Sequence, residues 1–385
     1  MATDPGRIEE LLAGLVRIES VTPWLIPDGA GEARIAAFAV DWLRDLPVEL
    51  TLDEVAPGRP NLIARLRGSG GGPTLCLNAH SDTVGYANWR ETALMPVRDG
   101  DRLVGLGAAD DKSCCTIALL ALRDLATEGS RLQGDLLVAL TVDEEGASIG
   151  TEDLVRRHPM DAAIVLEPEH AGEVIVEHQG FGWIDVVVYG RPAHGSNPEA
   201  GIDAIVRMAE VVRGLHRRDV EVYQAGPVPF NGRTVFHTST IRGGTDYATY
   251  PASAVLGIEI GTQPGERLAD RVREIEETFS EVRAIFPDFR GEVNVRLERE
   301  PFRARGHDSL LAAADRAALA VLGRPLERVG LNAWTDAALM QAAGIPTIEM
   351  GPAGGNFHAP QEWVSLPEMA QLLEIVRRTA ADFLG

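Results

Sequence analysis

Several strand-like apolar runs of this sequence end at a histidine or at carboxylates. Residues 74–77 lead to His80 and Asp82, residues 136–142 lead to Asp143-Glu144-Glu145, and residues 162–166 lead to Glu167. A fourth run, residues 346–350, precedes a glycine-rich loop that carries His358. In open α/β sheets, ligands bind just beyond the carboxyl ends of the strands. The repetition of this arrangement predicts one metal-dependent active site.

Each motif taken alone has an ordinary alternative explanation. His80 and Asp82 share a face of an extended chain, so Asp82 can fix the tautomer of a metal-bound His80, but such pairs also occur without metal. Glu144 and Glu145 could belong to a solvated loop. A bound cation would remove the repulsion between such clustered acids and would explain why they are adjacent.

Asp110 and His194 lie at the starts of two predicted helices. Asp110 precedes a helical pattern over residues 112–125, where an acid also serves as a cap that suits the helix dipole. His194 lies in a glycine-flanked loop before a second helix, expected from about Pro198, because proline suits the first helical turn. Such a loop can present an imidazole to a neighbour, or His194 can be an ordinary surface residue.

Two imidazoles and several carboxylates form a mixed nitrogen and oxygen ligand set. This set suits zinc, and cobalt or manganese could replace it. A carboxylate can bridge two divalent cations, as in two-metal hydrolytic sites. The expected chemistry is attack by a water that the metal activates, while a free carboxylate nearby takes its proton.

The elements that carry these residues alternate between strand-like and helical segments. Apolar runs predict strands at residues 61–66, 74–77, 136–142 and 162–166, around the helix at residues 112–125. This alternation is typical of an α/β domain with a mixed, mostly parallel sheet and crossover helices. The pattern resumes near the C-terminus, with helices at residues 309–322, 336–343 and 366–383 and a strand at residues 346–350.

Between these two parts the pattern changes to β-α-β-β-α-β. Strands are predicted at residues 183–189, 235–241, 253–260 and 292–297, with helices at about 198–215 and 267–285. This order is the signature of a ferredoxin-like α+β unit. We therefore expect a discontinuous catalytic domain, residues 1–179 and 300–385, with an inserted lid or dimerisation domain at residues 180–299.

Composition excludes several other classes of function. The 385 residues carry a formal net charge of -21, which argues against nucleic acid and against anionic membranes as partners. No apolar run is long enough to span a bilayer. Three cysteines are too few for a disulfide framework and indicate a reducing, cytoplasmic environment.

Together these motifs resemble the dinuclear zinc amidohydrolases that include acetylornithine deacetylase, succinyl-diaminopimelate desuccinylase, glutamate carboxypeptidase and aminoacylase. The resemblance covers nearly the full length, including the inserted domain. It depends on residues 78–84, 107–112, 143–146 and 193–196, on Glu167-Pro168, and on His358 followed by Glu362-Trp363-Val364.

The resemblance implies a role for each candidate residue. Asp110 would bridge two divalent cations; His80 and Glu167 would complete one metal site, and Glu145 and His358 the other. Glu144 would be the general base and later the proton donor to the leaving amine, and Asp82 would orient His80. His194 would reach the active site of a partner subunit and stabilise the oxyanion, which implies a homodimer.

The chain departs from the family pattern where members commonly hold a substrate carboxylate. Ala248 stands where many members carry Asn, and Gly261 stands where many carry Arg. Neither residue can supply the missing hydrogen bond or charge. Either Arg233 or Arg242 replaces them, or the substrate lacks a free carboxylate.

We therefore expect a metal-dependent hydrolase that cleaves the amide bond of a small N-acylated amino acid or related amine. A dipeptidase or carboxypeptidase acting on short peptides is the alternative, although Gly261 weighs against the carboxypeptidase. A non-catalytic binding protein on the same fold would have lost a metal ligand or the base. None of these residues is missing from the sequence.

Overall fold

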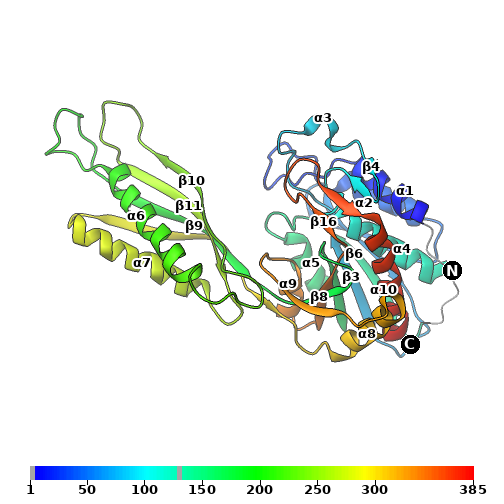
Figure 1. Ribbon diagram of the computed structural model, residues 1–385. Coiled ribbons are helices and arrows are strands. Elements are labelled where there is room, and N and C mark those ends of the chain that lie inside the picture. Colours follow the sequence, from blue (N-terminus) through cyan, green and yellow to red (C-terminus); the bar gives the residue numbers. More distant parts are fainter. Residues whose placement is uncertain (1–4, 128–131) are drawn as a thin grey trace. The chain divides into compact units, whose positions relative to one another are not determined.

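The computed structural model describes residues 5–127 and 132–385, which form two compact units (Figure 1). Unit 1 contains the residues up to Val176, together with Ala304–Val329 and Thr335–Gly385. Unit 2 contains Glu177–Arg303 and Gly330–Trp334. The sequence predicts domain boundaries at residues 180 and 299. That the two parts are separate domains remains a prediction.

The main sheet of unit 1 has a parallel centre and antiparallel flanks. Its strands follow the order β1-β2-β6-β3-β7-β15-β8. The pairs β6–β3, β3–β7 and β7–β15 are parallel, and the pairs β1–β2, β2–β6 and β15–β8 are antiparallel. The bounds are β1 (Glu49–Ala56), β2 (Arg59–Leu66), β3 (Thr74–His80), β6 (Asp135–Thr141), β7 (Ala162–Leu166), β15 (Thr347–Met350) and β8 (Glu173–His178). The predicted mixed α/β sheet is confirmed.

The central strands are apolar along almost their whole length because helices cover both faces of the sheet. On one face α4 packs against β3 and is itself covered by α1 and α10, so its residues are buried on nearly every side. On the other face α5 packs against β6 and α9 against β15. The helices of unit 1 are α1 (Pro5–Val16), α2 (Ala33–Leu43), α3 (Arg90–Ala93), α4 (Lys112–Thr127), α5 (Ile149–Arg157), α8 (Asp308–Leu322), α9 (Ala337–Ala342) and α10 (Leu366–Leu384).

A second, small antiparallel sheet of unit 1 brings together two segments that are far apart in the sequence. Its order is β16-β17-β5-β4, with β4 (Val97–Asp99), β5 (Arg102–Val104), β16 (Gly354–Gly355) and β17 (Trp363–Ser365). Two short strands, β13 (Phe302–Arg303) and β14 (Glu327–Leu331), pair with β8. None of the helices within the described residues is long and apolar enough to cross a membrane.

Unit 2 is an antiparallel sheet with two helices on one face. The sheet order is β10-β11-β9-β12, and α6 and α7 pack side by side against it (Figure 1). The elements are β9 (Gly180–Tyr189), α6 (Ala204–Arg218), a π-helical turn (Asp219–Tyr223), β10 (Phe236–Gly243), β11 (Ser253–Thr262), α7 (Leu268–Ile285) and β12 (Arg290–Arg299). The predicted ferredoxin-like order is confirmed.

The predicted start of α6 at about Pro198 is wrong. The helix begins at Ala204, because Asp203 is extended and its carboxylate accepts hydrogen bonds from Ile205 N (2.9 Å) and Val206 N (3.1 Å). This is the standard N-cap arrangement. Ile202 forms a β-bridge with Arg191 instead of a helical turn.

Candidate metal centre

The parallel strands place the predicted site residues at one edge of the unit 1 sheet. His80 is the last residue of β3 and pairs with Thr141, the last residue of β6. Glu144 follows three residues after β6, and Glu167 directly follows β7. Since the carboxyl ends of parallel strands meet at the same edge, these side chains converge there.

Asp110 lies between the two candidate imidazole ligands. Its Oδ1 is 2.9 Å from His80 Nε2, and its Oδ2 is 3.4 Å from His358 Nε2. Each carboxylate oxygen therefore faces a different histidine. This is the placement that a carboxylate bridging two cations requires.

The glutamates divide between the two sides of Asp110. Glu167 Oε1 lies 3.9 Å from His80 Nε2, and Glu145 Oε2 lies 3.1 Å from His358 Nε2. Ligand atoms of His80, Asp110 and Glu145 all lie within 4.8 Å of one another, as do those of His80, Glu144 and Glu167. The structure thus brings together all five predicted metal ligands and the predicted base.

The donor set fits divalent cations in charge as well as in geometry. Within the described residues, the ion pairs of Asp110, Glu145 and Glu167 are made only with His80 and His358. Glu145 Oε1 is buried and has no hydrogen-bond partner in the part of the chain that the structure describes. Clustered carboxylates with so few counter-charges are costly to ionise, and two cations would compensate them.

The titration behaviour of the centre reflects this crowding. Burial raises the pKa of Glu144, Glu145 and Glu167 above the ordinary glutamate range, and neighbouring carboxylates add to it. Burial also opposes ionisation of Asp110, but hydrogen bonds from His358 and His80 outweigh it and lower its pKa. The hydrogen bonds that Asp110 and Glu145 accept from His358 raise the pKa of this histidine to about 11.

Asp82 organises the turn that carries the two acids. Its Oδ1 accepts the backbone N–H of Glu144 (3.1 Å) and lies 3.4 Å from His80 Nδ1, while its Oδ2 accepts the N–H of Glu145 (3.2 Å). Asp82 is completely buried. The side chain therefore contacts the imidazole that it was predicted to orient, and it also fixes the backbone of the neighbouring acids.

A buried ionic network lies beside this turn, and the sequence does not predict it. Arg59 Nη1 donates to Asp143 Oδ1 (2.7 Å), Arg59 also pairs with both oxygens of Glu32, and Thr22 Oγ1 donates to Asp143 Oδ1 (3.1 Å). Asp143 has a positive φ of 70°. The network thus holds the residue that directly precedes Glu144. Little in the sequence indicates this network, because Glu32 and Arg59 lie in different segments that share no motif.

The three remaining candidates belong to unit 2. His194 is exposed, and its Nδ1 accepts the N–H of Ser196 (3.2 Å). Arg233 donates to Gly226 O (2.7 Å). Arg242 lies on the exposed strand β10. Whether any of them acts at a metal centre remains a prediction.

The structure leaves little space for a side chain at position 261. A Cβ atom at Gly261 would lie 2.5 Å from Gln179 Oε1 and 3.0 Å from Val235 N. Gln179 is buried, and its side chain is fixed because Oε1 accepts Val235 N and Nε2 donates to Arg233 O (2.5 Å). The space next to Gly261 is therefore already occupied.

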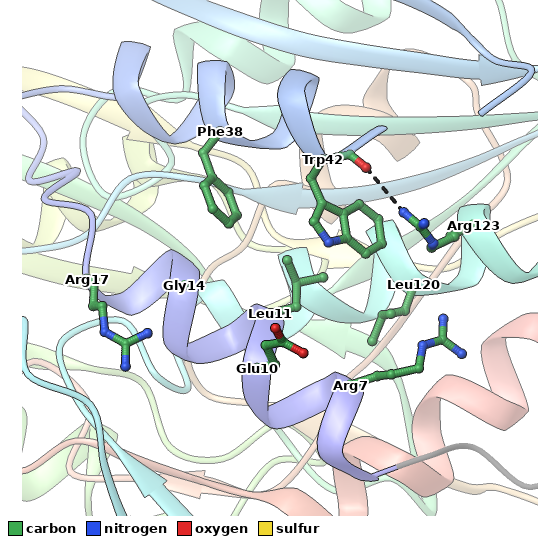
Figure 2. Close-up of a pocket in the computed structure, with 9 residues that line it drawn as sticks. All are labelled: Arg7, Glu10, Leu11, Gly14, Arg17, Phe38, Trp42, Leu120 and Arg123. Carbon is green, nitrogen blue, oxygen red and sulfur yellow. Dashed lines mark hydrogen bonds between the residues drawn. The ribbon is translucent and has the colours of Figure 1, made fainter. Parts of the chain in front are cut away.

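A cavity elsewhere in unit 1 contains none of these residues. It has a volume of about 660 Å³ and lies between α1, α2 and α4 (Figure 2). Arg7, Arg17 and Arg123 line it together with Phe38 and Trp42, and Arg123 donates to Trp42 O (3.2 Å). It makes no contribution to the candidate centre.

Comparison with known proteins gives one family for most of the chain. Residues 76–382 match the family model described as peptidase family M20/M25/M40. The chain is 28% identical over 368 residues to an acetylornithine deacetylase of Proteus mirabilis (strain HI4320), covering 92% of this chain and 91% of that protein. It is also 28% identical over 383 residues to carboxypeptidase G2 of Pseudomonas sp. (strain RS-16), covering 96% and 88%.

The fold has solved counterparts as well. One is the crystal structure of a Bacillus subtilis protein described as a dinuclear metal-binding peptidase from the M20 family. It superimposes with a TM-score of 0.72 at 17% identity, covering 99% of this chain and 98% of that one.

Proposed function

The chain belongs to peptidase family M20/M25/M40, and from this premise we propose that it is a dinuclear metal hydrolase that removes the acyl group from a small N-acylated amino acid or related amine. As a member of this family it is a hydrolase that acts on N-acyl amino acids or peptides. The observation that carries the proposal is the position of Asp110, with one carboxylate oxygen toward His80 and the other toward His358.

We propose zinc as the native metal. His80 and Glu167 would hold one cation, Glu145 and His358 would hold the other, and Asp110 would bridge them. Two imidazoles with carboxylates form a donor set that zinc favours. When bound, two divalent cations supply Lewis-acid activation of the amide carbonyl and of a water molecule.

Glu144 is the proposed general base. It lies with His80 and Glu167, and its backbone is fixed by Asp82. Burial raises its pKa, which suits a group that must take a proton from water and then return it to the leaving amine. Asp110, Glu145 and Glu167 are the proposed ligands, and Asp82 accepts backbone N–H groups, so Glu144 is the acid that we assign to proton transfer.

His194 is the proposed oxyanion donor, supplied by a partner subunit. Its Nδ1 is engaged by Ser196, whose hydroxyl and backbone N–H lie at 2.8 and 3.2 Å, so Nε2 is the ring nitrogen available to a substrate. An exposed Nε2–H is the donor that a developing oxyanion needs. This role requires a homodimer.

Hydrolysis of short peptides is the second candidate function, and Gly261 bears on it. The place next to this glycine is occupied by Gln179, so it offers no cationic group to a terminal carboxylate. Arg233 donates to Gly226 O, which leaves Arg242 as the more available cation. Comparing matched substrates that end in a free acid or in its amide separates the two functions. A strong preference for the free acid would favour a peptidase.

The Glu144→Gln variant tests the proposal. The change keeps the side-chain volume but removes the base, so kcat on a panel of N-acyl amino acids should fall by about 10²–10⁴-fold or more. Metal content should remain that of the unchanged protein, because Glu144 is not among the proposed ligands. Unchanged turnover would show that another group takes the proton.

A further inference from the structure

Glu362 joins two loops that carry proposed metal ligands. Its side chain is 1% exposed. Oε1 accepts the backbone N–H groups of Ala109 (2.8 Å) and Asp110 (2.9 Å), and Oε2 accepts that of Gly107 (3.0 Å). The backbone carbonyl of Glu362 also accepts the N–H of Gly105 (2.9 Å). One residue therefore satisfies four donors of the loop that ends at Asp110.

The other end of this connection is the segment that carries His358. Glu362 directly precedes β17, which pairs with β16 on one side and with β5 on the other. His358 lies in the loop between β16 and β17. At the base of this loop, Gly354 approaches so closely that a Cβ there would lie 2.6 Å from Ala109 Cβ. The two loops are therefore packed together as well as hydrogen-bonded.

Glu362 forms no ion pair with any other described residue. Among the described residues its carboxylate is matched only by peptide N–H groups. The nearby Lys112 is fully buried, but its Nζ donates to Ile18 O (2.8 Å).

We propose that Glu362 is a positioning residue, which holds the backbone of Asp110 so that its carboxylate faces both cations and which couples this loop to that of His358. The inference rests on the proposed metal centre. Glu362 touches neither cation nor substrate; it acts through Asp110. Groups that orient metal ligands typically change metal affinity by 10–100-fold when they are altered.

The first test compares Glu362→Gln with Glu368→Gln in metal-free protein. Glu368 is a matched control, since its Oε2 also joins two loops of unit 1 by accepting the N–H groups of Ala171 (2.9 Å) and Ala353 (3.1 Å). Zinc affinity is measured by competition with a chromophoric chelator, and thermal unfolding is recorded for each apoprotein. We expect zinc affinity to fall about 10–100-fold in Glu362→Gln and to stay within about twofold in Glu368→Gln.

A loss of thermal stability in Glu362→Gln with unchanged zinc affinity would overturn the proposal, because the residue would then be only structural. An equal loss of affinity in both variants would overturn it too. If the wild-type apoprotein itself binds fewer than two zinc ions, the proposed function fails and not this inference.

The second test uses the wild-type chain and so does not depend on how a variant folds. If Glu362 holds the loop, the amides of Gly107, Ala109 and Asp110 are protected from hydrogen exchange in the apoprotein and gain little protection when zinc binds. Fast exchange of these amides in apoprotein, with protection appearing only on zinc addition, would show that the metal orders the loop and would overturn the proposal.

Discussion

At the residue scale, the candidate site depends on buried acids whose surroundings differ. Asp110 receives hydrogen bonds from two imidazoles, which lower its pKa, whereas burial raises the pKa of Glu144. Asp110 is therefore suited to remain ionised and bind cations, whereas Glu144 is suited to exchange a proton. Two carboxylic acids can thus take different roles within one centre, because their surroundings differ.

Glu349 is a buried acid outside the centre whose titration should be visible in stability. It lies on β15, its Oε2 accepts the hydroxyl of Thr335 (2.8 Å), and its Oε1 has no hydrogen-bond partner among the described residues. Burial raises its pKa from 4.5 to about 8. The folded state therefore binds an extra proton between these pH values, and the free energy of unfolding should fall by about 1.4 kcal/mol per pH unit as pH rises through that window.

The Glu349→Gln variant removes this titration. Its stability relative to the wild type should rise from pH 5 to pH 8 by a few kcal/mol. Urea unfolding of both proteins at several pH values measures the difference, and a Gln substitution at the exposed Glu91 serves as the control. Parallel stability curves for wild type and Glu349→Gln would show that this acid is already ionised in the folded state.

Residue types and spacing predict the side chains that the structure brings together, because histidines and acids after parallel strands converge at one edge of the sheet. The supporting side chains were harder to find. Glu32 and Arg59 meet only in the folded chain, and the role of Glu362 depends on backbone N–H groups that a sequence does not display. The sequence shows that Gly261 departs from the family pattern, but it does not show that Gln179 occupies the space beside this glycine.

At the element scale, the turn after β6 is held from two sides. Asp82 binds the backbone of Glu144 and Glu145, and the ion pairs of Arg59 with Glu32 and Asp143 fix the start of the turn. The side chains of Glu32 and Asp143 are 0% and 2% exposed. Removing one partner from such a network leaves uncompensated buried charge.

The Arg59→Met variant should therefore lose about 3–5 kcal/mol of stability. Thermal or urea unfolding measures the loss, and kcat should fall with it because the turn carries Glu144. Arg67→Met is the matched control: Arg67 also pairs with two acids, Glu49 and Asp135, but its side chain is 58% exposed, so little change is expected. Equal effects of the two substitutions would contradict the account of the network.

The elements themselves were predictable where the apolar pattern was strong and long. The central strands and α4, α7, α8 and α10 lie close to their expected positions. The helices α2 and α5 and the short strands of the second sheet were not predicted. Strands of two or three residues, such as β16 and β17, carry no period and exist because of tertiary pairing. The sequence predicts the start of α6 near Pro198, but the helix begins after Asp203. The side chain of Asp203 caps the first turn and fixes the start more strongly than a proline does.

At the scale of the whole molecule, the proposed trans role of His194 predicts complementation between two inactive variants. The variants His194→Ala and Glu144→Gln are mixed under conditions that allow subunits to exchange. In a heterodimer, the site that retains Glu144 receives His194 from its partner, so activity should reappear. Light scattering should show a dimer.

The mixture is compared with each variant alone at the same total concentration. Activity that does not exceed the sum of the two variants, in samples where subunit exchange is demonstrated, would mean that His194 acts within its own chain or not at all. A fully active monomer would exclude the trans role directly.

The central claim is that two cations lie on either side of Asp110. Anomalous diffraction from crystals of zinc-loaded protein, recorded at the zinc edge, tests it most directly. We expect two peaks about 3.5–4 Å apart, one beside His80 and Glu167 and the other beside Glu145 and His358. A single peak, or peaks away from Asp110, would contradict this account.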